Sequence, residues 1–166
     1  MNAVEQRGLW LEEFSAGTTY LHRPGRTVTE ADNTFFTTQT MNTQPLHLDA
    51  AWASTQHGFR GERLVNSMFT LSTVVGLSVN QLTLGTIVAN LGFSDVAFPA
   101  PMFHGDTLYA ETTCMSTRVS ESRPGQGVVE LRHVGRNQHG DVVCTAVRST
   151  LVRRRPEQPG EQGAGS

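Results

Sequence analysis

The sequence predicts an α+β domain in which one antiparallel sheet wraps around one long helix. Residues 64–80 are mostly apolar on every side of a helix, with small residues between the large ones, as in a buried helix. Val and Thr in this stretch also favour strands, so a strand remains the alternative there. Stretches rich in β-branched residues and bounded by turns follow at residues 86–98, 107–119, 127–136 and 142–153. Helices followed by consecutive strands are typical of α+β proteins.

Further helices are expected in the first half of the chain, after a short strand near residues 18–22 in an otherwise irregular segment. The hydroxyl of Thr29 can cap a helix that runs to about Met41, and Asp32 at its third position completes a capping box. Pro45 prevents this helix from continuing, because proline lacks the amide hydrogen and its ring clashes with the preceding turn.

Asp49 can cap a second, short helix over residues 50–56. Later in the chain, residues 123–127 and 137–141 carry glycines where hairpin connections need a positive φ. The pattern predicts one domain over residues 1–155.

Length, composition and charge exclude several kinds of protein. The 166 residues fit one domain, and residues 156–166, rich in Pro, Gly and Gln, are expected to be disordered. A net charge of -2 gives no general attraction to nucleic acid. No apolar run approaches the roughly 20 residues that span a bilayer, and no secretory leader is expected. Cys114 and Cys144 are expected to be unpaired, buried thiols in a reducing cytoplasm, without the spacing of a metal site.

The segment Asn42-Thr-Gln-Pro-Leu-His47 carries the pattern with most chemical content. A carboxamide and an imidazole that straddle a proline are expected on a helix end and the loop after it, where both can reach one water molecule. About twenty residues later, Asn66-Ser67-Met68 opens the long apolar helix, whose first amides can receive an oxyanion. This combination favours hydration or dehydration beside a thioester carbonyl.

These motifs resemble those of the MaoC-like (R)-specific enoyl-CoA hydratases, a family with the hotdog fold. The family signature Asp-x-Asn-Pro-(aliphatic)-His matches residues 42–47, and its His-Gly-Met motif matches residues 66–68. The segment Pro101-Met-Phe-His-Gly-Asp-Thr-Leu108 is similar to a turn of the family, and residues 26–32 also match. The resemblance covers residues 8–153 and implies a hotdog fold with an antiparallel sheet around a central helix.

Several positions depart from the family pattern. Asn42 stands where the family has its catalytic Asp, Gln44 replaces an Asn, and Ser67 replaces a Gly. The chain is similar here to a subgroup that acts on C5 dicarboxylyl thioesters such as mesaconyl- or itaconyl-CoA. The resemblance therefore implies that substrate class, which composition and spacing do not.

The expected mechanism uses three groups. Neutral imidazole can accept a proton from water near neutral pH, so His47 is the candidate base. Asn42 cannot accept a proton, but its carbonyl can orient the water. The backbone N–H of Ser67 can stabilise the enolate oxygen with help from the helix dipole. Asn42 as a helix C-cap and His47 as a loop histidine bonded to backbone remain the structural alternatives.

Four more residues are candidates for substrate binding. Gln44 and Asn66 can contact the substrate or satisfy loop backbone, and both interpretations stay open. Arg60 and Arg63 are expected near the mouth of the pocket, where they can meet coenzyme A phosphates or simply face solvent. Neither the chemistry nor the sequence calls for a metal or redox cofactor, since coenzyme A is part of the substrate.

The interpretation of the whole chain is an enoyl-CoA hydratase that works as a homodimer or higher homo-oligomer, since the edge or face of its sheet is expected to pair. One alternative is an acyl-CoA thioesterase on the same fold, although no acidic residue occupies the matching position. A second alternative, kept open by Asn42, is a non-catalytic subunit that binds acyl-CoA.

Overall fold

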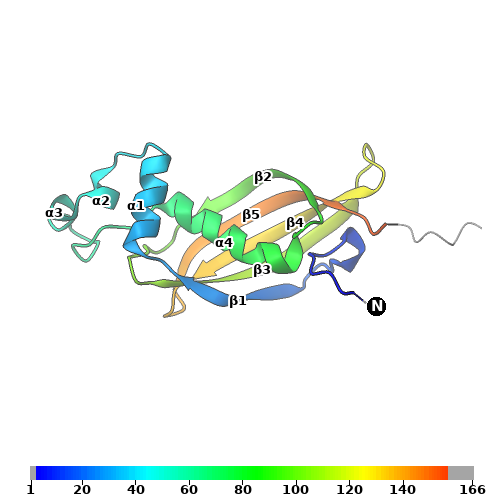
Figure 1. The fold of residues 1–166 in the computed structure, drawn as a ribbon, viewed down its shortest axis with the longest axis horizontal. Coiled ribbons are helices and arrows are strands. Elements are labelled where there is room, and N and C mark those ends of the chain that lie inside the picture. The colour runs from blue at the N-terminus through cyan, green and yellow to red at the C-terminus, as the bar shows by residue number, and fades with distance from the viewer. Residues whose placement is uncertain (1–2, 157–166) are drawn as a thin grey trace, which may run out of the picture.

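In the computed structural model, which describes residues 3–156, five strands form one curled antiparallel sheet (Figure 1). They are β1 (Thr19–Thr27), β2 (Ile87–Ala97), β3 (Thr107–Val119), β4 (Gln126–Arg136) and β5 (Val142–Arg153). Their order across the sheet is β1-β3-β4-β5-β2, so β1 and β2 are the two edge strands. The four stretches predicted after the long helix therefore all form strands, within about a residue of the predicted bounds.

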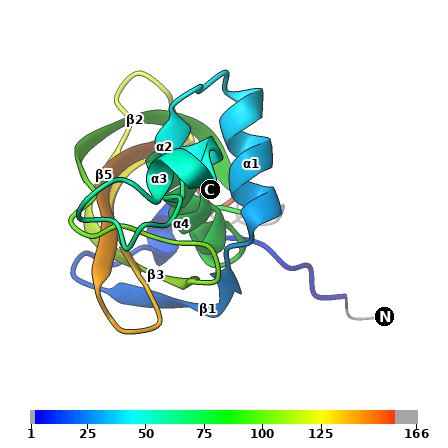
Figure 2. The ribbon, with the colours of Figure 1, turned by 90° about the vertical axis from the view of Figure 1, so that its left-hand side faces the viewer.

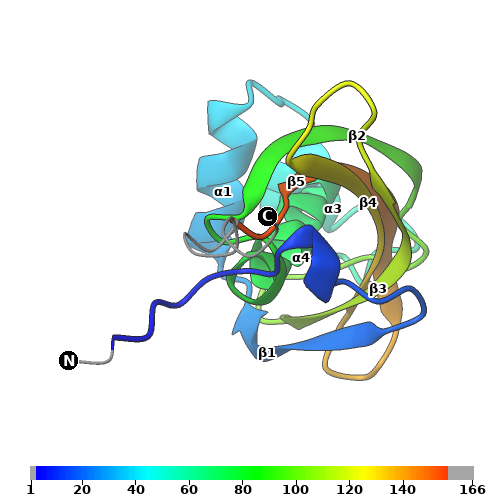
Figure 3. The same cartoon turned by 90° about the vertical axis from the view of Figure 1, so that its right-hand side faces the viewer.

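The helix α4 (Ser67–Leu82) lies along the inner face of the sheet, which curls around it (Figure 3). Three shorter helices, α1 (Glu30–Gln39), α2 (Pro45–Leu48) and α3 (Ala50–Ala53), gather beyond the N-terminal end of α4 (Figures 1 and 2). A turn of 3-10 helix at Leu11–Glu13 lies near the opposite end of the sheet. The predicted sheet around a central helix is confirmed, and the strand alternative for residues 64–80 is wrong.

Local capping signals place the ends of the short helices. The hydroxyl of Thr29 accepts the N–H of Asp32, and the Asp32 carboxylate accepts the N–H of Thr29, so the predicted capping box is present. Asp49 caps α3 through the N–H of Trp52, as predicted. Pro45 begins α2 instead of lying in a loop, because the first helical position needs no amide hydrogen.

The first strand is longer than the sequence predicts. Pro24 and Gly25 lie just after the strand that the sequence predicts near residues 18–22. The pairing of β1 with β3 shifts register between His22 and Arg26 and then resumes, so the strand reaches Thr27. A bulge at an edge strand accommodates a proline without loss of the strand.

One face of α4 is open in the single chain, which corrects the expectation of a helix buried on all sides. Residues such as Phe69 and Val74 pack on the sheet, whereas Met68 is 53% exposed and Ser72 and Gly76 also face outward. The helix begins at Ser67 and not at Leu64, because the side chain of Asn66 caps it. Ser72 and Gly76 are small, so their side chains protrude little from the open face of α4.

A row of polar side chains crosses the sheet beneath α4 and separates two apolar clusters. The cluster nearer the short helices includes Val74 and Leu108, and the other includes Leu82 and Leu131. Between them lie His22 of β1, Thr112 of β3, His133 of β4, Arg148 of β5 and Asn90 of β2. Apolar packing on both sides buries the first four of these residues, whereas Asn90 on the edge strand is exposed.

Hydrogen bonds link the members of this row. The hydroxyl of Thr112 lies 2.8 Å from His22 Nε2 and 2.8 Å from His133 Nδ1, and Arg148 Nε donates to Asn90 Oδ1 at 3.1 Å. Burial lowers the pKa of His133 to about 3, with further lowering by the charge of Arg148. His133 is therefore neutral at neutral pH.

Cys114 and Cys144 are both free and buried, as predicted. Burial raises the pKa of both thiols, to about 11 for Cys144. Residues 157–166 lie outside the described residues. The disorder expected for residues 156–166 therefore stays a prediction. Within residues 3–156, no helix combines the length and apolarity of a membrane span, and His, Cys, Asp and Glu do not gather in threes as metal ligands.

The depressed pKa of His133 predicts acid sensitivity. Between pH 6.5 and about 3 the unfolded chain binds a proton at this site that the folded chain does not, so stability falls as pH falls. Each pH unit in that window costs about 1.4 kcal/mol from this residue. His133→Asn keeps a donor for Thr112 but cannot titrate. Urea unfolding from pH 7 to pH 4 should show a shallower pH slope for this variant; an identical slope would contradict the assignment.

Candidate active site

The imidazole of His47 is held by the backbone of a distant segment. His47 lies in α2, not in the loop expected from the sequence, and its Nδ1 lies 3.0 Å from the carbonyl oxygen of Leu64. A carbonyl can only accept, so Nδ1 carries the hydrogen and a neutral ring leaves Nε2 with a free lone pair. The amide of Leu64 donates to the carbonyl of Leu46 at 3.1 Å, which ties the same two segments together a second time.

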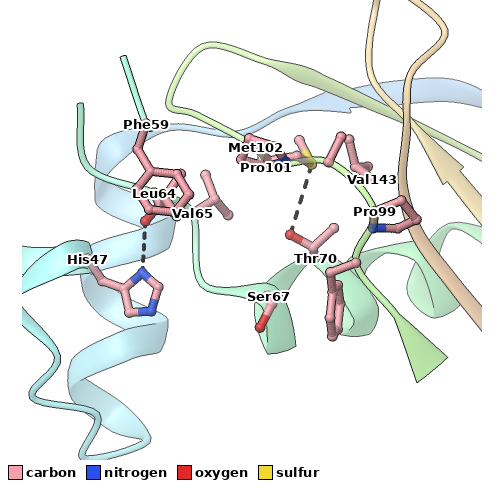
Figure 4. Close-up of a pocket in the computed structure, with 12 residues that line it drawn as sticks. His47, Phe59, Leu64, Val65, Ser67, Thr70, Pro99, Pro101, Met102 and Val143 are labelled. Carbon is pink, nitrogen blue, oxygen red and sulfur yellow. Dashed lines mark hydrogen bonds between the residues drawn. The ribbon is translucent and has the colours of Figure 1, made fainter. Parts of the chain in front are cut away.

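A cavity of about 320 Å³ opens beside His47 (Figure 4). Its walls come from α2, the start of α4 and the loop between β2 and β3. The lining side chains are mostly apolar: Phe59, Leu64, Val65, Thr70, Phe98, Pro99, Ala100, Pro101, Met102 and Val143, together with His47 and Ser67. An apolar cavity with few polar groups is the usual form of a small-molecule site.

Ser67, the first residue of α4, lies on the same cavity. The side chain of Asn66 accepts the N–H of Met68 at 3.0 Å, which satisfies the next amide of the helix. In the part of the chain that the structure describes, the N–H of Ser67 itself has no hydrogen-bond partner. The cavity lining therefore includes a histidine whose Nδ1 is bound to backbone and the first residue of a helix, whose amide is free.

The structure does not bring Asn42 into this cavity. Its Oδ1 accepts the N–H of Gln44 at 3.0 Å, so the oxygen expected to orient a water helps to form the turn between α1 and α2. Asn42 is also not the left-handed residue after α1, because Met41 has the positive φ of 55°. The role of Asn42 in binding water stays a prediction.

Gln44 and Asn66 both take positions at helix starts, and neither is among the residues that line the cavity. Gln44 is the exposed residue before α2, and its backbone, not its side chain, makes the contact with Asn42. Asn66 is buried, and its Nδ2 donates to the hydroxyl of Thr37 at 3.3 Å while its Oδ1 caps α4. The structural interpretation of Asn66 accounts for both ends of its side chain.

The two arginines differ in their surroundings. Arg63 forms a salt bridge with Glu30, and its side chain is only 15% exposed. Arg60 is exposed, has a φ of 55°, and stacks over the ring of Phe103 with its guanidinium carbon 4.7 Å from the ring centre. Arg60 is therefore the more accessible of the two for an anion.

Residues 104–106 form a tight turn, as the structural interpretation of the sequence expected. Gly105 has a φ of 90°, which glycine adopts without strain. The carboxylate of Asp106 accepts the N–H of Phe103 at 2.8 Å and the side-chain amide of Gln138 at 2.7 Å. The turn fixes Met102 and Phe103, and the carbonyl of Met102 accepts the N–H of Val65 at 2.9 Å.

Sequence reasoning missed most of the apolar wall and one buried polar residue. Phe98 and Met102 lie at the end of a predicted strand and within a motif, where nothing in the pattern assigns them to a pocket. Asn33, which is fully buried in α1 and hydrogen-bonded to the loop before α4, was not singled out. The helix around Asn33 is polar on most sides, so its burial has no periodic signal.

Comparison with known proteins agrees with this architecture. Residues 13–148 match the family model of the MaoC like domain, and the chain belongs to this family. A solved monoamine oxidase regulatory protein of Archaeoglobus is similar with a TM-score of 0.80 at 30% identity, covering 92% of this chain and all of that one. A Mycobacterium tuberculosis protein described as a double hotdog fold is similar with a TM-score of 0.78 at 23% identity, over 92% of this chain and 47% of that one. The fold is the hotdog fold.

Two curated relatives are much longer than this chain. The beta-methylmalyl-CoA dehydratase of Chloroflexus aurantiacus is 32% identical over 96% of this chain, and the mesaconyl-CoA hydratase of Haloarcula hispanica is 30% identical over 97% of it. In both cases the match covers only 44% of the relative. The chain thus spans less than half the length of these relatives.

Proposed function

We propose that the cavity at His47 binds an enoyl thioester of coenzyme A and catalyses reversible addition of water to its double bond. The observation that carries this proposal is the pairing of a histidine whose Nδ1 is bound to backbone with the free amide of Ser67 on one apolar cavity. The family and the names of the relatives support the same reaction class.

Each step follows from the chemistry of these groups. The lone pair on His47 Nε2 accepts a proton from a water as its oxygen attacks Cβ, and the Leu64 carbonyl stabilises the imidazolium that forms. Electron density moves to the thioester oxygen, where the Ser67 N–H and the dipole of α4 stabilise the enolate. The imidazolium then returns its proton to Cα.

The proposed substrate is a C5 dicarboxylyl-CoA such as mesaconyl- or itaconyl-CoA. Among the cavity-lining residues no Asp or Glu is present, so a second carboxylate on the acyl chain meets no lining anion. Position 42 does not line the cavity, but a substrate carboxylate about 4 Å from an Asp there would meet a like charge, which costs roughly 4 kcal/mol at an effective dielectric constant of 20. Asn42 in place of the family's Asp removes that repulsion. Arg60 is the proposed contact for the coenzyme A phosphates.

The thioesterase alternative needs a carboxylate to activate water at the carbonyl carbon, and the described cavity lining supplies none. The alternative of a non-catalytic binding subunit rests on Asn42. Binding of acyl-CoA without loss of the conjugated double bond would favour that alternative. Two buried, free thiols fit the proposed cytoplasmic location.

We further propose that the chain pairs through strand β2 with a second hotdog domain, which in a homo-oligomer is a second copy of this chain. This edge strand and the residue after it expose Val88, Leu91, Phe93, Val96 and Phe98. A long, apolar edge strand can pair with a strand of another chain unless it is covered. Phe98 also lines the cavity, so a domain seated on β2 would lie next to the site.

Replacement of His47 tests the base. His47→Ala should lower kcat for mesaconyl-CoA by about 10²–10⁴-fold, the usual contribution of an acid–base group. The rate is followed by the loss of conjugated thioester absorbance. His139→Ala, which changes an exposed histidine outside the cavity lining, serves as the control and should retain full activity. Equal rates for His47→Ala and the native protein would exclude His47 as the base.

Replacement of Asn42 tests the charge argument. Asn42→Asp should shift the ratio of kcat/KM values toward an uncharged enoyl-CoA such as crotonyl-CoA and away from mesaconyl-CoA, because the new carboxylate repels the substrate's own. Parallel assays of both substrates with both proteins measure the ratio. An unchanged ratio would show that position 42 does not sense the charge of the acyl chain.

A matched pair of variants tests the interface. Leu91→Glu on β2 should dissociate the oligomer, since it places a charge on the proposed contact, whereas Leu21→Glu on the opposite edge strand should not. The two leucines have similar exposure, 52% and 58%. Light scattering after size-exclusion chromatography gives the masses. A native monomer, or dissociation by Leu21→Glu alone, would contradict pairing through β2.

A further inference from the structure

Asn33 contacts three of the segments that build the cavity, although it does not line the cavity itself. Its Nδ2 donates to the carbonyl of Leu64 at 3.0 Å and to Nε2 of His104 at 3.0 Å, and it lies 3.4 Å from the carbonyl oxygen of His47 in α2. Its Oδ1 accepts the backbone N–H of Asn66 at 2.8 Å. A fully buried carboxamide with both ends bonded is rigid, because each alternative position leaves polar atoms unpaired.

The Leu64 carbonyl connects Asn33 to His47. It accepts the Nδ1–H of His47 and the Nδ2–H of Asn33, both at 3.0 Å, and a carbonyl oxygen has two lone pairs for two donors. The donor from Asn33 occupies one lone pair of the oxygen and holds the carbonyl in place, which leaves the other lone pair for the Nδ1–H of His47. The position of this acceptor decides where the His47 ring lies and which ring nitrogen keeps its hydrogen.

The opposite end of Asn33 acts on the start of α4. Its Oδ1 holds the amide of Asn66, the residue that caps the helix and precedes Ser67. A shift of this contact moves the Ser67 N–H relative to His47. One buried side chain therefore fixes both polar elements of the cavity.

We propose that Asn33 is a positioning residue for the reaction at this site, holding the His47 ring through the Leu64 carbonyl and the Ser67 amide through Asn66. This inference rests on the proposed function for its kinetic consequences. Its structural consequence, the protonation pattern of the His47 ring, does not depend on which reaction the site catalyses.

His104 completes the arrangement as an acceptor. It can accept from Asn33 only while its Nε2 carries no hydrogen, which requires a neutral ring. Burial lowers the pKa of His104, and the charge of Arg63 lowers it further, while Glu30 and Glu62 act in the opposite direction. The ring is therefore neutral at neutral pH and keeps its acceptor.

The variant Asn33→Asp separates the two ends of the side chain. A carboxylate still accepts the N–H of Asn66 but cannot donate to Leu64. Thr37→Val is the matched control: Thr37 is equally buried one turn further along α1, and its hydroxyl contacts Asn33 and Asn66 but not Leu64. Asn33→Ser, which removes both arms without adding a charge, is the second test variant if the aspartate variant does not fold.

The ring nitrogens of His47 provide the direct readout, because their ¹⁵N chemical shifts distinguish the two neutral tautomers. At pH 8 the native protein and Thr37→Val should show the Nδ1–H tautomer, whereas Asn33→Asp and Asn33→Ser should show a mixture. Kinetics with mesaconyl-CoA should show kcat reduced by about 10–100-fold in the Asn33 variants, with KM changed much less, because the loss is one of orientation.

Two outcomes would overturn the proposal. One is an unchanged His47 tautomer in both Asn33 variants, and the other is that Thr37→Val changes the tautomer and kcat as much as the Asn33 variants do. Thermal unfolding of each variant separates loss of stability from loss of orientation, because Thr37→Val should lower stability without changing the tautomer. If the native protein hydrates no enoyl-CoA, the proposed function fails, and the tautomer measurement still decides the role of Asn33.

Discussion

The carbonyl oxygen of Leu64 is the constraint on which the candidate site depends. It belongs to the last extended segment before α4, and it accepts hydrogen bonds from a histidine on α2 and an asparagine on α1. These three segments are distant in sequence, so the carbonyl fixes the imidazole only after the fold has formed. Without this acceptor His47 would be an ordinary histidine on a four-residue helix.

The hotdog architecture supplies the other half of the site by placing the N-terminus of α4 at the end of the sheet where α1 to α3 gather. Sheet strands enclose the helix, and the loop between β2 and β3 closes the cavity with Phe98 and Met102. The polar row at His133 lies deeper along the helix and separates the two apolar clusters.

Much of the fold could be predicted from the sequence because its signals are local. β-branched runs between glycine-rich turns gave the strands, and the Thr29–Asp32 capping box placed the start of α1. The spacing of the motifs brought out His47 and Ser67, which do lie on one cavity. These features depend on neighbours within a few residues, or on a pattern that a family resemblance made visible.

Other features depend on contacts that no local pattern records. The burial of Asn33 follows from loops that are about 30 and 70 residues away along the chain. The Oδ1 of Asn42, which the motif predicts to orient a water, accepts the backbone N–H of Gln44. Apolar residues around α4 indicated burial on all sides, but a single chain covers only one face of the helix. In the two longer relatives, more than half of the sequence lies outside the part that matches this chain.

The central claim is that this cavity adds water across a double bond through one histidine. The most direct measurement is the reaction of mesaconyl-CoA in deuterium oxide, with the products analysed by NMR and mass spectrometry. The account predicts a hydroxyacyl-CoA that carries a single deuterium at Cα in one configuration, with no release of free coenzyme A. Release of the coenzyme A thiol with the double bond intact would contradict it.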